Sequence, residues 1–306
     1  MSDEPVAGAA PPDYRCGFAA IVGRPNVGKS TLLNALLGRK ISIVSPKPQT
    51  TRHRILGILT RPDAQVIFVD TPGLHAGARR AMNRHMNRAA LASLQDADVN
   101  VFVVEALRWS DEDQRVLDEL VKQGRPIILV LNKADKVFPK ERLLPFIEEV
   151  GRRAQFAEVV PLSALKHNNL EQLPATIARY LPLSPPHFPE DQLTDRSDQF
   201  QAAEIVREKL TLRLRQELPY GLTVVIEQFK EEDGRLLINA VIWVERSGQK
   251  AIVIGNGGEQ LKEVGRSARL EMVELFKRPV HLELWVKVKE NWSDNETALR
   301  QLGYET

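Results

Sequence analysis

The chain has few cysteines, no long apolar runs and little net charge, which are features that often identify a class of protein directly. It has one cysteine in 306 residues, Cys16, so no intrachain disulfide can form, which fits a reducing compartment. No stretch approaches the roughly 18 apolar residues of a membrane-spanning helix. Net charge is only +2, so bulk charge does not indicate a nucleic-acid partner. Residues 1–12 lack the apolar segment of a signal peptide, and we expect a disordered lead-in.

What remains is the composition of an ordinary globular protein, long enough for two domains. Across residues 17–180, short apolar runs alternate with amphipathic segments, which predicts a mostly parallel sheet with helices on both faces. The stretch from 55 to 69 is too short for a crossover helix and should form an antiparallel hairpin. The apolar runs are 18–22, 55–59, 66–69, 101–104, 127–131 and 159–162, and the helical patterns are 30–37, 80–94, 113–122, 142–153 and 170–181.

The last third of the chain has a different pattern. Four prolines fall within residues 181–189, which predicts a stiff, extended linker. Beyond it, helical and strand patterns follow in the order α-β-β-α-α-β, typical of a smaller α+β domain. The expected divisions are a lead-in at 1–14, a first domain at 15–181, a linker at 182–196, a second domain at 197–290 and a C-terminal tail at 291–306.

The first chemical motif is a phosphate-binding loop. The residues from Gly23 to Ser30 match G-x-x-x-x-G-K-[ST] between a strand-like and a helix-like run, the context that the motif requires. Backbone N–H groups and the helix N-terminus then converge on phosphates. We expect Lys29 beside the β- and γ-phosphates and the Ser30 hydroxyl on Mg²⁺. The predicted phosphate contacts are Gly23, Arg24, Pro25, Asn26, Val27, Gly28, Lys29, Ser30 and Thr31.

Three more motifs follow apolar runs. Asp70 can hold Mg²⁺ through water, and the N–H of Gly73 can contact a γ-phosphate. The carboxylate of Asp135, in an N-K-A-D string, can accept from the N1–H and N2–H₂ of guanine, donors that adenine lacks. The four motifs in this order predict a guanine-nucleotide switch. Further phosphate contacts are expected at Asp70, Thr71, Pro72 and Gly73, and base contacts at Asn132, Lys133 (whose stem can cover the base), Asp135 and the backbone N–H groups of Ser163, Ala164 and Leu165.

These motifs resemble those of the translation-factor-related GTPases, in their usual order. Within that group, the run from Gln49 to His53 resembles the switch segment of the Era family. In that family a threonine here completes the Mg²⁺ shell when GTP is bound. The resemblance implies this role for Thr51, with Thr50 as the alternative. Without the resemblance, a polar loop would be the default interpretation.

Two positions bear on hydrolysis. Ras-like proteins are similar here but carry a water-orienting glutamine where this chain has Leu74, so we expect slow intrinsic hydrolysis. No catalytic residue is identified with certainty, and the expected γ-phosphate and transition-state contacts are Lys29, Thr51 and Gly73. In similar GTPases an asparagine at the position of Asn26 helps to hold K⁺ near the phosphates, and we hypothesise that K⁺ supplies some transition-state charge.

The second domain contains an I-G-x-x-G pattern between two helical segments. Glycines there allow an RNA backbone to approach closely, and the pattern resembles the clamp of a type II KH domain. A glycine-rich helix cap and turn is the alternative. Many such clamps carry a basic residue between the glycines, which this one lacks. The predicted RNA contacts are Ile254, Gly255, Asn256, Gly257, Gly258 and the nearby Lys262.

The resemblance to the Era family covers about residues 15–290. It implies a Mg²⁺-dependent GTP/GDP switch that binds 16S rRNA near its 3′ end and assists assembly of the 30S ribosomal subunit. It also implies a cytoplasmic protein that associates peripherally with the bacterial inner membrane. A GTPase subunit driving an RNA-modification complex is the alternative function, and a membrane-remodelling GTPase is disfavoured by the KH-like half. The sequence leaves the oligomeric state open, and we expect a monomer.

Overall fold

The protein forms two compact units, each built from segments that are not contiguous in the sequence. The computed structural model describes residues 11–47, 50–72, 81–214 and 221–304. One unit, the G unit, comprises residues 1–40, 54–71 and 91–195, and the other, the C unit, comprises 41–53, 72–90 and 196–306. Two short segments from the first third of the chain therefore fold with the C-terminal residues. The proline-rich linker belongs to the G unit as far as Asp195.

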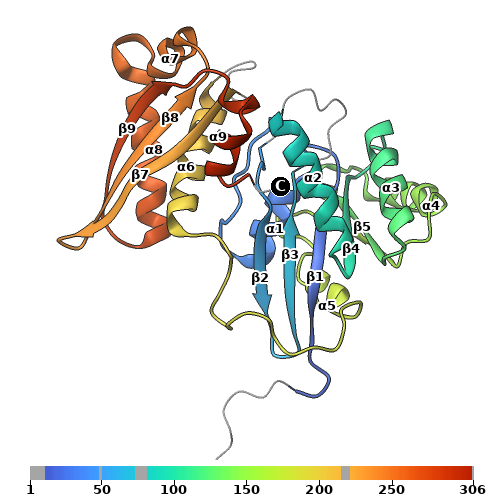
Figure 1. The fold of residues 1–306 in the computed structure, drawn as a ribbon. Helices are drawn as coiled ribbons and strands as arrows, with labels where there is room; N and C mark the ends of the chain where they lie inside the picture. The colour runs from blue at the N-terminus through green and yellow to red at the C-terminus, as the bar shows by residue number, and fades with distance from the viewer. Residues whose placement is uncertain (1–10, 48–49, 73–80, 215–220, 305–306) are drawn as a thin grey trace, which may run out of the picture. The chain divides into compact units, whose positions relative to one another are not determined.

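A six-stranded sheet forms the centre of the G unit, in the order β2-β3-β1-β4-β5-β6 (Figure 1). β2 and β3 are an antiparallel hairpin, and the other neighbours are parallel, which confirms the predicted mostly parallel α/β sheet. All seven residues of β3 are buried, as expected for a parallel strand covered on both faces. The strands are β1 (Arg15–Val22), β2 (Ile55–Thr60), β3 (Ala64–Asp70), β4 (Val99–Glu105), β5 (Ile127–Asn132) and β6 (Glu158–Pro161).

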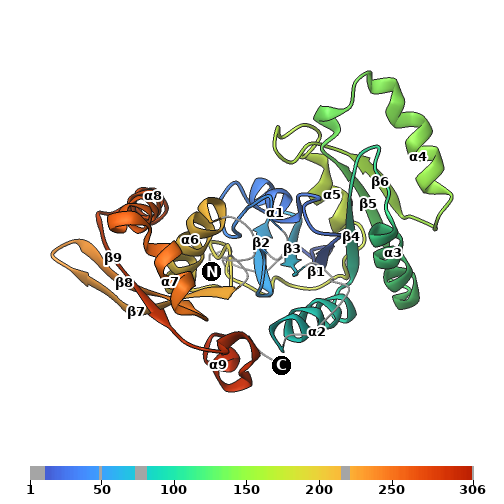
Figure 2. The ribbon, with the colours of Figure 1, turned by 90° about the horizontal axis from the view of Figure 1, so that it is seen from above.

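Helices cover both faces of this sheet. Figure 2 shows α1 and α5 on one face and α3 on the other. α3 begins at a capping box in which Ser110 and Asp113 bond each other's backbone N–H groups, so its N-terminus is fixed beside the end of β4. The helices of the G unit are α1 (Lys29–Leu37), α3 (Asp111–Gln123), η1 (Ala134–Lys136), η2 (Lys140–Arg142), α4 (Leu143–Gly151) and α5 (Gln172–Ala178). A further helix, α2 (Ala81–Gln95), is divided between the units, with residues 81–90 in the C unit.

The C unit has the predicted α-β-β-α-α-β order. Its sheet runs β7-β8-β9, with β7 antiparallel and β9 parallel to β8. One face of the sheet packs on α6 and α8 around buried Ile238, Val264 and Met272. This is the smaller α+β domain expected from the sequence. Its elements are α6 (Asp198–Arg213), β7 (Leu222–Glu232), β8 (Arg235–Val244), α7 (Ser247–Ile254), η4 (Asn256–Gly258), α8 (Glu259–Phe276) and β9 (Val280–Val288).

The packed structure extends beyond both ends assigned from the sequence. Tyr14, placed in the lead-in, is buried in a small cluster of the G unit. The expected tail carries η5 (Trp292–Asp294) and α9 (Glu296–Gln301). Trp292 is fully buried, in a cluster that includes Met82 of α2 and Leu299 of α9. The side chains of Trp292 and Leu299 are thus part of a buried cluster, and η5 and α9 belong to the C unit. Across the described part of the chain, none of the helices combines the length and apolar character that crossing a bilayer requires.

Candidate guanine-nucleotide site

The phosphate loop connects β1 to α1, and two of its positions admit only glycine. Gly23 and Gly28 have φ values of 151° and 101°, which side-chain-bearing residues rarely adopt. A Cβ on Gly23 would lie 2.3 Å from the carbonyl oxygen of Val103, and one on Gly28 would lie 2.4 Å from Nδ2 of Asn132. The loop backbone therefore lies directly against the ends of β4 and β5.

Lys29 and Ser30 begin α1 at the positions that the motif predicts. Lys29 Nζ donates to the carbonyl oxygens of Gly23 and Arg24, at 2.8 and 2.9 Å. Burial lowers the pKa of Lys29 to about 8, although the charge of Asp70 opposes the shift. The ammonium thus lies against the backbone of its own loop. Anionic oxygens would be stronger partners for it than these carbonyls.

Ser30 and Asp70 come together, as the sequence predicts for a shared metal ion. Ser30 Oγ lies 3.0 Å from Asp70 Oδ2, and Asp70 is fully buried at the end of β3. A hydroxyl and a carboxylate are hard oxygen donors of the kind that Mg²⁺ takes. This donor set fits Mg²⁺. Gly73, Leu74 and His75, which follow, lie outside the described residues.

Asn132 joins the phosphate loop to both predicted base loops. Its Nδ2 donates to the carbonyl oxygen of Val27 at 2.8 Å. Its Oδ1 accepts from the N–H groups of Lys133, at 2.8 Å, and Ala164, at 3.0 Å. One amide therefore holds three of the four sequence motifs in fixed register. Nothing in the N-K-x-D pattern itself indicates this structural role.

The structure uses the Ser163 and Ala164 N–H groups within the protein. The N–H of Ser163 donates to the carbonyl oxygen of Asn168 at 3.0 Å, and that of Ala164 donates to Asn132. From the sequence we expected both N–H groups to contact the guanine carbonyl. In the structure both donate to groups of the protein itself. Asp135 lies nearby, half-buried in η1, at the start of the segment that follows β5.

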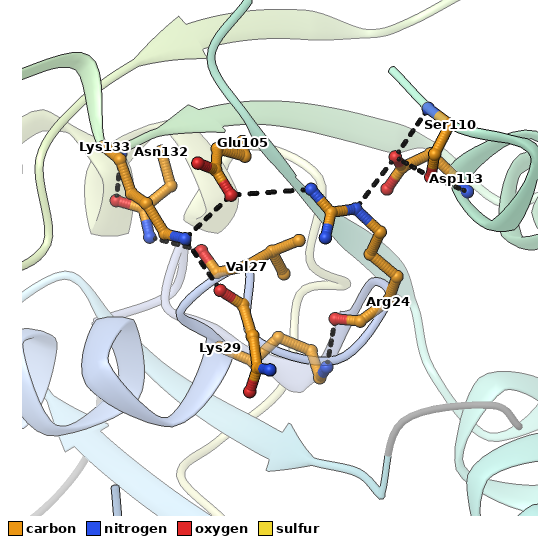
Figure 3. Close-up of polar contacts among 9 residues, drawn as sticks. Arg24, Val27, Lys29, Glu105, Ser110, Asp113, Asn132 and Lys133 are labelled. Atoms are coloured by element: carbon orange, nitrogen blue, oxygen red, sulfur yellow. Dashed lines mark hydrogen bonds and ion pairs between the residues drawn. The ribbon is translucent and has the colours of Figure 1, made fainter. Parts of the chain in front are cut away.

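A series of charged side chains links the phosphate loop to the first base loop, which begins at Asn132 (Figure 3). Lys133 Nζ donates to the carbonyl oxygen of Asn26 and to Glu105 Oε2, each at 2.8 Å. Arg24 Nη2 lies 3.5 Å from the same Glu105 oxygen, and Arg24 Nε donates to Asp113 Oδ2 at 3.0 Å. The Arg24 side chain is therefore committed to carboxylates, which leaves its backbone for phosphate contact. Sequence reasoning singled out neither Glu105 nor Asp113.

Residues 41–53, which include the run predicted to carry the switch threonine, belong to the C unit and are called the switch segment below. Arg52, 2% exposed, donates to the carbonyl oxygen of Leu222 at 2.7 Å. Arg207 of α6 forms a buried ion pair with Glu204 and donates to the carbonyl oxygen of Thr50 at 2.5 Å. Thr51 between them is 7% exposed. On one side of the predicted Mg²⁺ ligand Arg207 thus binds the backbone of Thr50, and on the other side the Arg52 side chain binds the backbone of Leu222.

The glycine-rich turn of the C unit has the geometry of a backbone-binding clamp. Gly255 (φ 76°) cannot carry a side chain, because a Cβ would lie 2.6 Å from Cβ of Gln260. Gly257 and Gly258 also have positive φ, at 58° and 82°, and face open space. Gly258 caps α8, and Asn256, Gly257 and Lys262 are exposed. The turn leaves the N-terminal N–H groups of an 18-residue helix accessible to an anion.

Comparisons with known proteins agree with both the nucleotide-binding motifs and the glycine-rich turn. A family model described as a 50S ribosome-binding GTPase matches residues 18–133, and a KH domain model matches residues 217–293. GTPase Era from Marinobacter nauticus is 53% identical over 292 residues, covering 95% of this chain and 96% of that protein. GTPase Era from Coxiella burnetii is 54% identical over 294 residues, covering 96% and 99%.

Two solved structures are similar over the same extent. A variant of Aquifex aeolicus Era bound to GDP and tetrafluoroaluminate superposes with a TM-score of 0.92 at 43% identity, covering 95% of this chain and all of that one. A complex of Era with MgGDPNP and nucleotides 1506–1542 of 16S ribosomal RNA gives the same TM-score and identity, covering 96% and 100%. The likeness therefore extends over both units rather than over the nucleotide-binding half alone.

Proposed function

The chain belongs to the Era family of GTPases, and from this premise we propose that it is a GTP-hydrolysing switch that binds the 3′ region of 16S rRNA and acts in assembly of the 30S subunit. The observation that carries the proposal is the Asn132 amide, which holds the phosphate loop and both base loops together. The glycine-rich turn before α8 supplies the RNA-binding half, and a relative's complex contains both MgGDPNP and 16S rRNA.

Mg²⁺ would be held by the Ser30 hydroxyl and, through water, by Asp70. It would neutralise charge on the β- and γ-phosphates. Thr51 would complete the shell when GTP is bound, with Thr50 as the alternative. Lys29 would move from its loop carbonyls to the phosphates, where its charge is more favourably paired. Burial already limits water around this lysine, so its field on a phosphate is stronger than that of an exposed lysine.

The guanine base would lie between the two base loops. Asp135 would accept from N1–H and N2–H₂, and the Lys133 stem would cover one face of the ring. Since the Ser163 and Ala164 N–H groups bond within the protein, we assign the contact with the guanine carbonyl to the next N–H, that of Leu165. Leu165 is 68% exposed, which leaves its loop accessible to a ligand.

Hydrolysis would be slow and stimulated by K⁺. Leu74 cannot orient an attacking water, and Asn26, exposed at φ 65°, would help to hold K⁺ near the phosphates. GTPase rates measured in K⁺ and in Na⁺ at equal ionic strength test this. We expect a higher rate in K⁺ that disappears in Asn26→Gly, since glycine keeps the positive φ and removes the amide. Equal rates in the two salts would refute the role of K⁺.

The RNA-binding half is tested with a single-stranded oligonucleotide matching the 3′ end of 16S rRNA. Gly257→Asp should weaken binding at least fivefold, because a carboxylate beside a phosphate is repelled by about 1 kcal/mol or more. Gly234→Asp is the matched control, since that glycine also has positive φ (71°) and faces open space in the β7–β8 turn. GTP affinity should hold in both variants. Unchanged RNA affinity in Gly257→Asp would reject the clamp.

We place the protein in the cytoplasm, where 30S subunits are assembled, as a monomer that also associates peripherally with the inner membrane. Membership of the Era family supports this placement. Sedimentation with inverted inner-membrane vesicles, in GTP and in GDP, tests the membrane association, and a protein that stays in the supernatant in both would argue against it.

A further inference from the structure

Glu105 lies at the last position of β4, between the phosphate loop and the first base loop (Figure 3). One of its oxygens, Oε2, accepts from Lys133 Nζ at 2.8 Å and lies 3.5 Å from Arg24 Nη2. Burial alone would raise the pKa of Glu105. The hydrogen bond and charge of Lys133, with Arg24, nevertheless hold it below its ordinary value. The carboxylate is therefore ionised and shared between two cations from different loops.

The two cations depend on Glu105 to different degrees. Arg24 has a second and closer carboxylate, the fully buried Asp113 at 3.0 Å, which the Ser110 backbone N–H and hydroxyl also bind, at 3.0 and 2.7 Å. The Lys133 ammonium has only one other partner among the contacts that the structure gives it, the carbonyl oxygen of Asn26. Removing the charge at 105 thus leaves Arg24 paired and Lys133 held by a neutral group.

Lys133 needs such support, because its stem is a flexible chain with several rotatable bonds. A lysine already fixed across the loop loses less conformational freedom when a ring packs against its stem. Its backbone is fixed as well, at φ 62° and by the Asn132 side chain. Only the far end of the side chain then requires an anchor, and Glu105 provides it.

We propose that Glu105 is a positioning residue of the nucleotide site, which anchors the Lys133 ammonium against the phosphate loop so that the lysine stem lies ready over the guanine ring. The inference rests on the proposed GTP binding. Since the ring is common to GTP and GDP, Glu105 supports the affinity for both by the same factor. It thus sets how tightly the protein holds guanine nucleotides without favouring either state of the switch.

The test is the dissociation constant of fluorescent GDP and GTP derivatives, measured with Mg²⁺ on the full chain. Glu105→Gln keeps the size of the side chain and removes its charge. It should weaken both nucleotides equally, by about three- to tenfold, mainly through faster dissociation. Glu112→Gln, exposed on the first turn of α3, is the matched control and should match the wild type.

A double-mutant cycle with Lys133→Met, which keeps an apolar stem, identifies the route of action. In that background Glu105→Gln should change affinity less than twofold. A full loss in the Lys133→Met background, unequal losses for GDP and GTP, or wild-type affinity in the single variant would each overturn the inference. Failure of the wild-type chain to bind either nucleotide would instead reject the proposed function, so the two failures are distinguishable.

Discussion

The switch segment should make the C unit sensitive to mild acid through His53. The ring of His53 packs against Phe200 and Tyr304, with ring centroids 5.3 and 4.3 Å apart. Burial lowers the pKa of His53 to about 4, although the charge of Glu204 opposes the shift. In the unfolded chain a histidine titrates near pH 6.5. Between pH 6.5 and 4 the unfolded chain therefore binds a proton that the folded protein does not, and stability falls as pH falls.

The size of the effect follows from the two pKa values. At pH 7 neither state is much protonated. At pH 5 an unfolded histidine is almost fully protonated, whereas the folded His53 is about one-tenth protonated. The difference corresponds to a loss of up to about 2 kcal/mol between pH 7 and pH 5. That is a large part of the stability of an ordinary domain.

Urea unfolding at pH 7, 6 and 5, followed by tryptophan fluorescence, measures this loss. His53→Phe keeps a ring between the same neighbours and removes the titrating group, so its free energy of unfolding should fall by about 2 kcal/mol less over the same interval. His281→Gln, exposed on β9, is the control and should fall as the wild type does, because His53 is intact. An equal fall in wild type and His53→Phe would show that burial does not hold the ring neutral.

Two further outcomes are expected. Asp135→Asn should make the protein prefer xanthosine triphosphate over GTP, because xanthine carries a carbonyl where guanine has the N2 amine. Competition binding measures this preference. A variant that still prefers GTP would show that Asp135 does not contact the base. Arg207→Met should destabilise the protein by about 3 kcal/mol and speed tryptic cleavage of the switch segment, because the buried Glu204 loses its partner and the carbonyl of Thr50 its donor. Arg213→Met, which removes an exposed pair on the same helix, should be cleaved at the wild-type rate, and equal cleavage of both variants would contradict the role of Arg207.

Local pattern predicted most of the fold. The α-β-β-α-α-β order of the C unit agrees with the sequence prediction, because strong apolar periodicity and flanking glycine or proline residues mark its elements. The hairpin of β2 and β3 was predictable because the segment 55–69 is too short to contain a crossover helix. The phosphate loop and base loops were recognisable because each has a fixed spacing that chemistry imposes on neighbouring residues.

The unpredicted features depend on partners far along the chain. Glu105 and Asp113 are ordinary acidic residues at a strand end and in a first helical turn, and only the fold brings Arg24 and Lys133 to them. The placement of the switch segment depends on contacts such as Arg207 to Thr50, 157 residues apart. No local spacing encodes a contact of that range.

The mixed origin of the C unit has a consequence for how the protein is made. Synthesis runs from the N-terminus at about 5–20 residues per second, so residues 41–53 and 72–90 leave the ribosome long before 196–306 exist. Met82 shares a buried cluster with Trp292 and Leu299, more than 200 residues later. For roughly 10–50 s of translation, then, these early segments have no finished unit to join. Thr50 of the switch segment gains its Arg207 contact only once α6 has been made, and His53 gains its contact with Tyr304 later still.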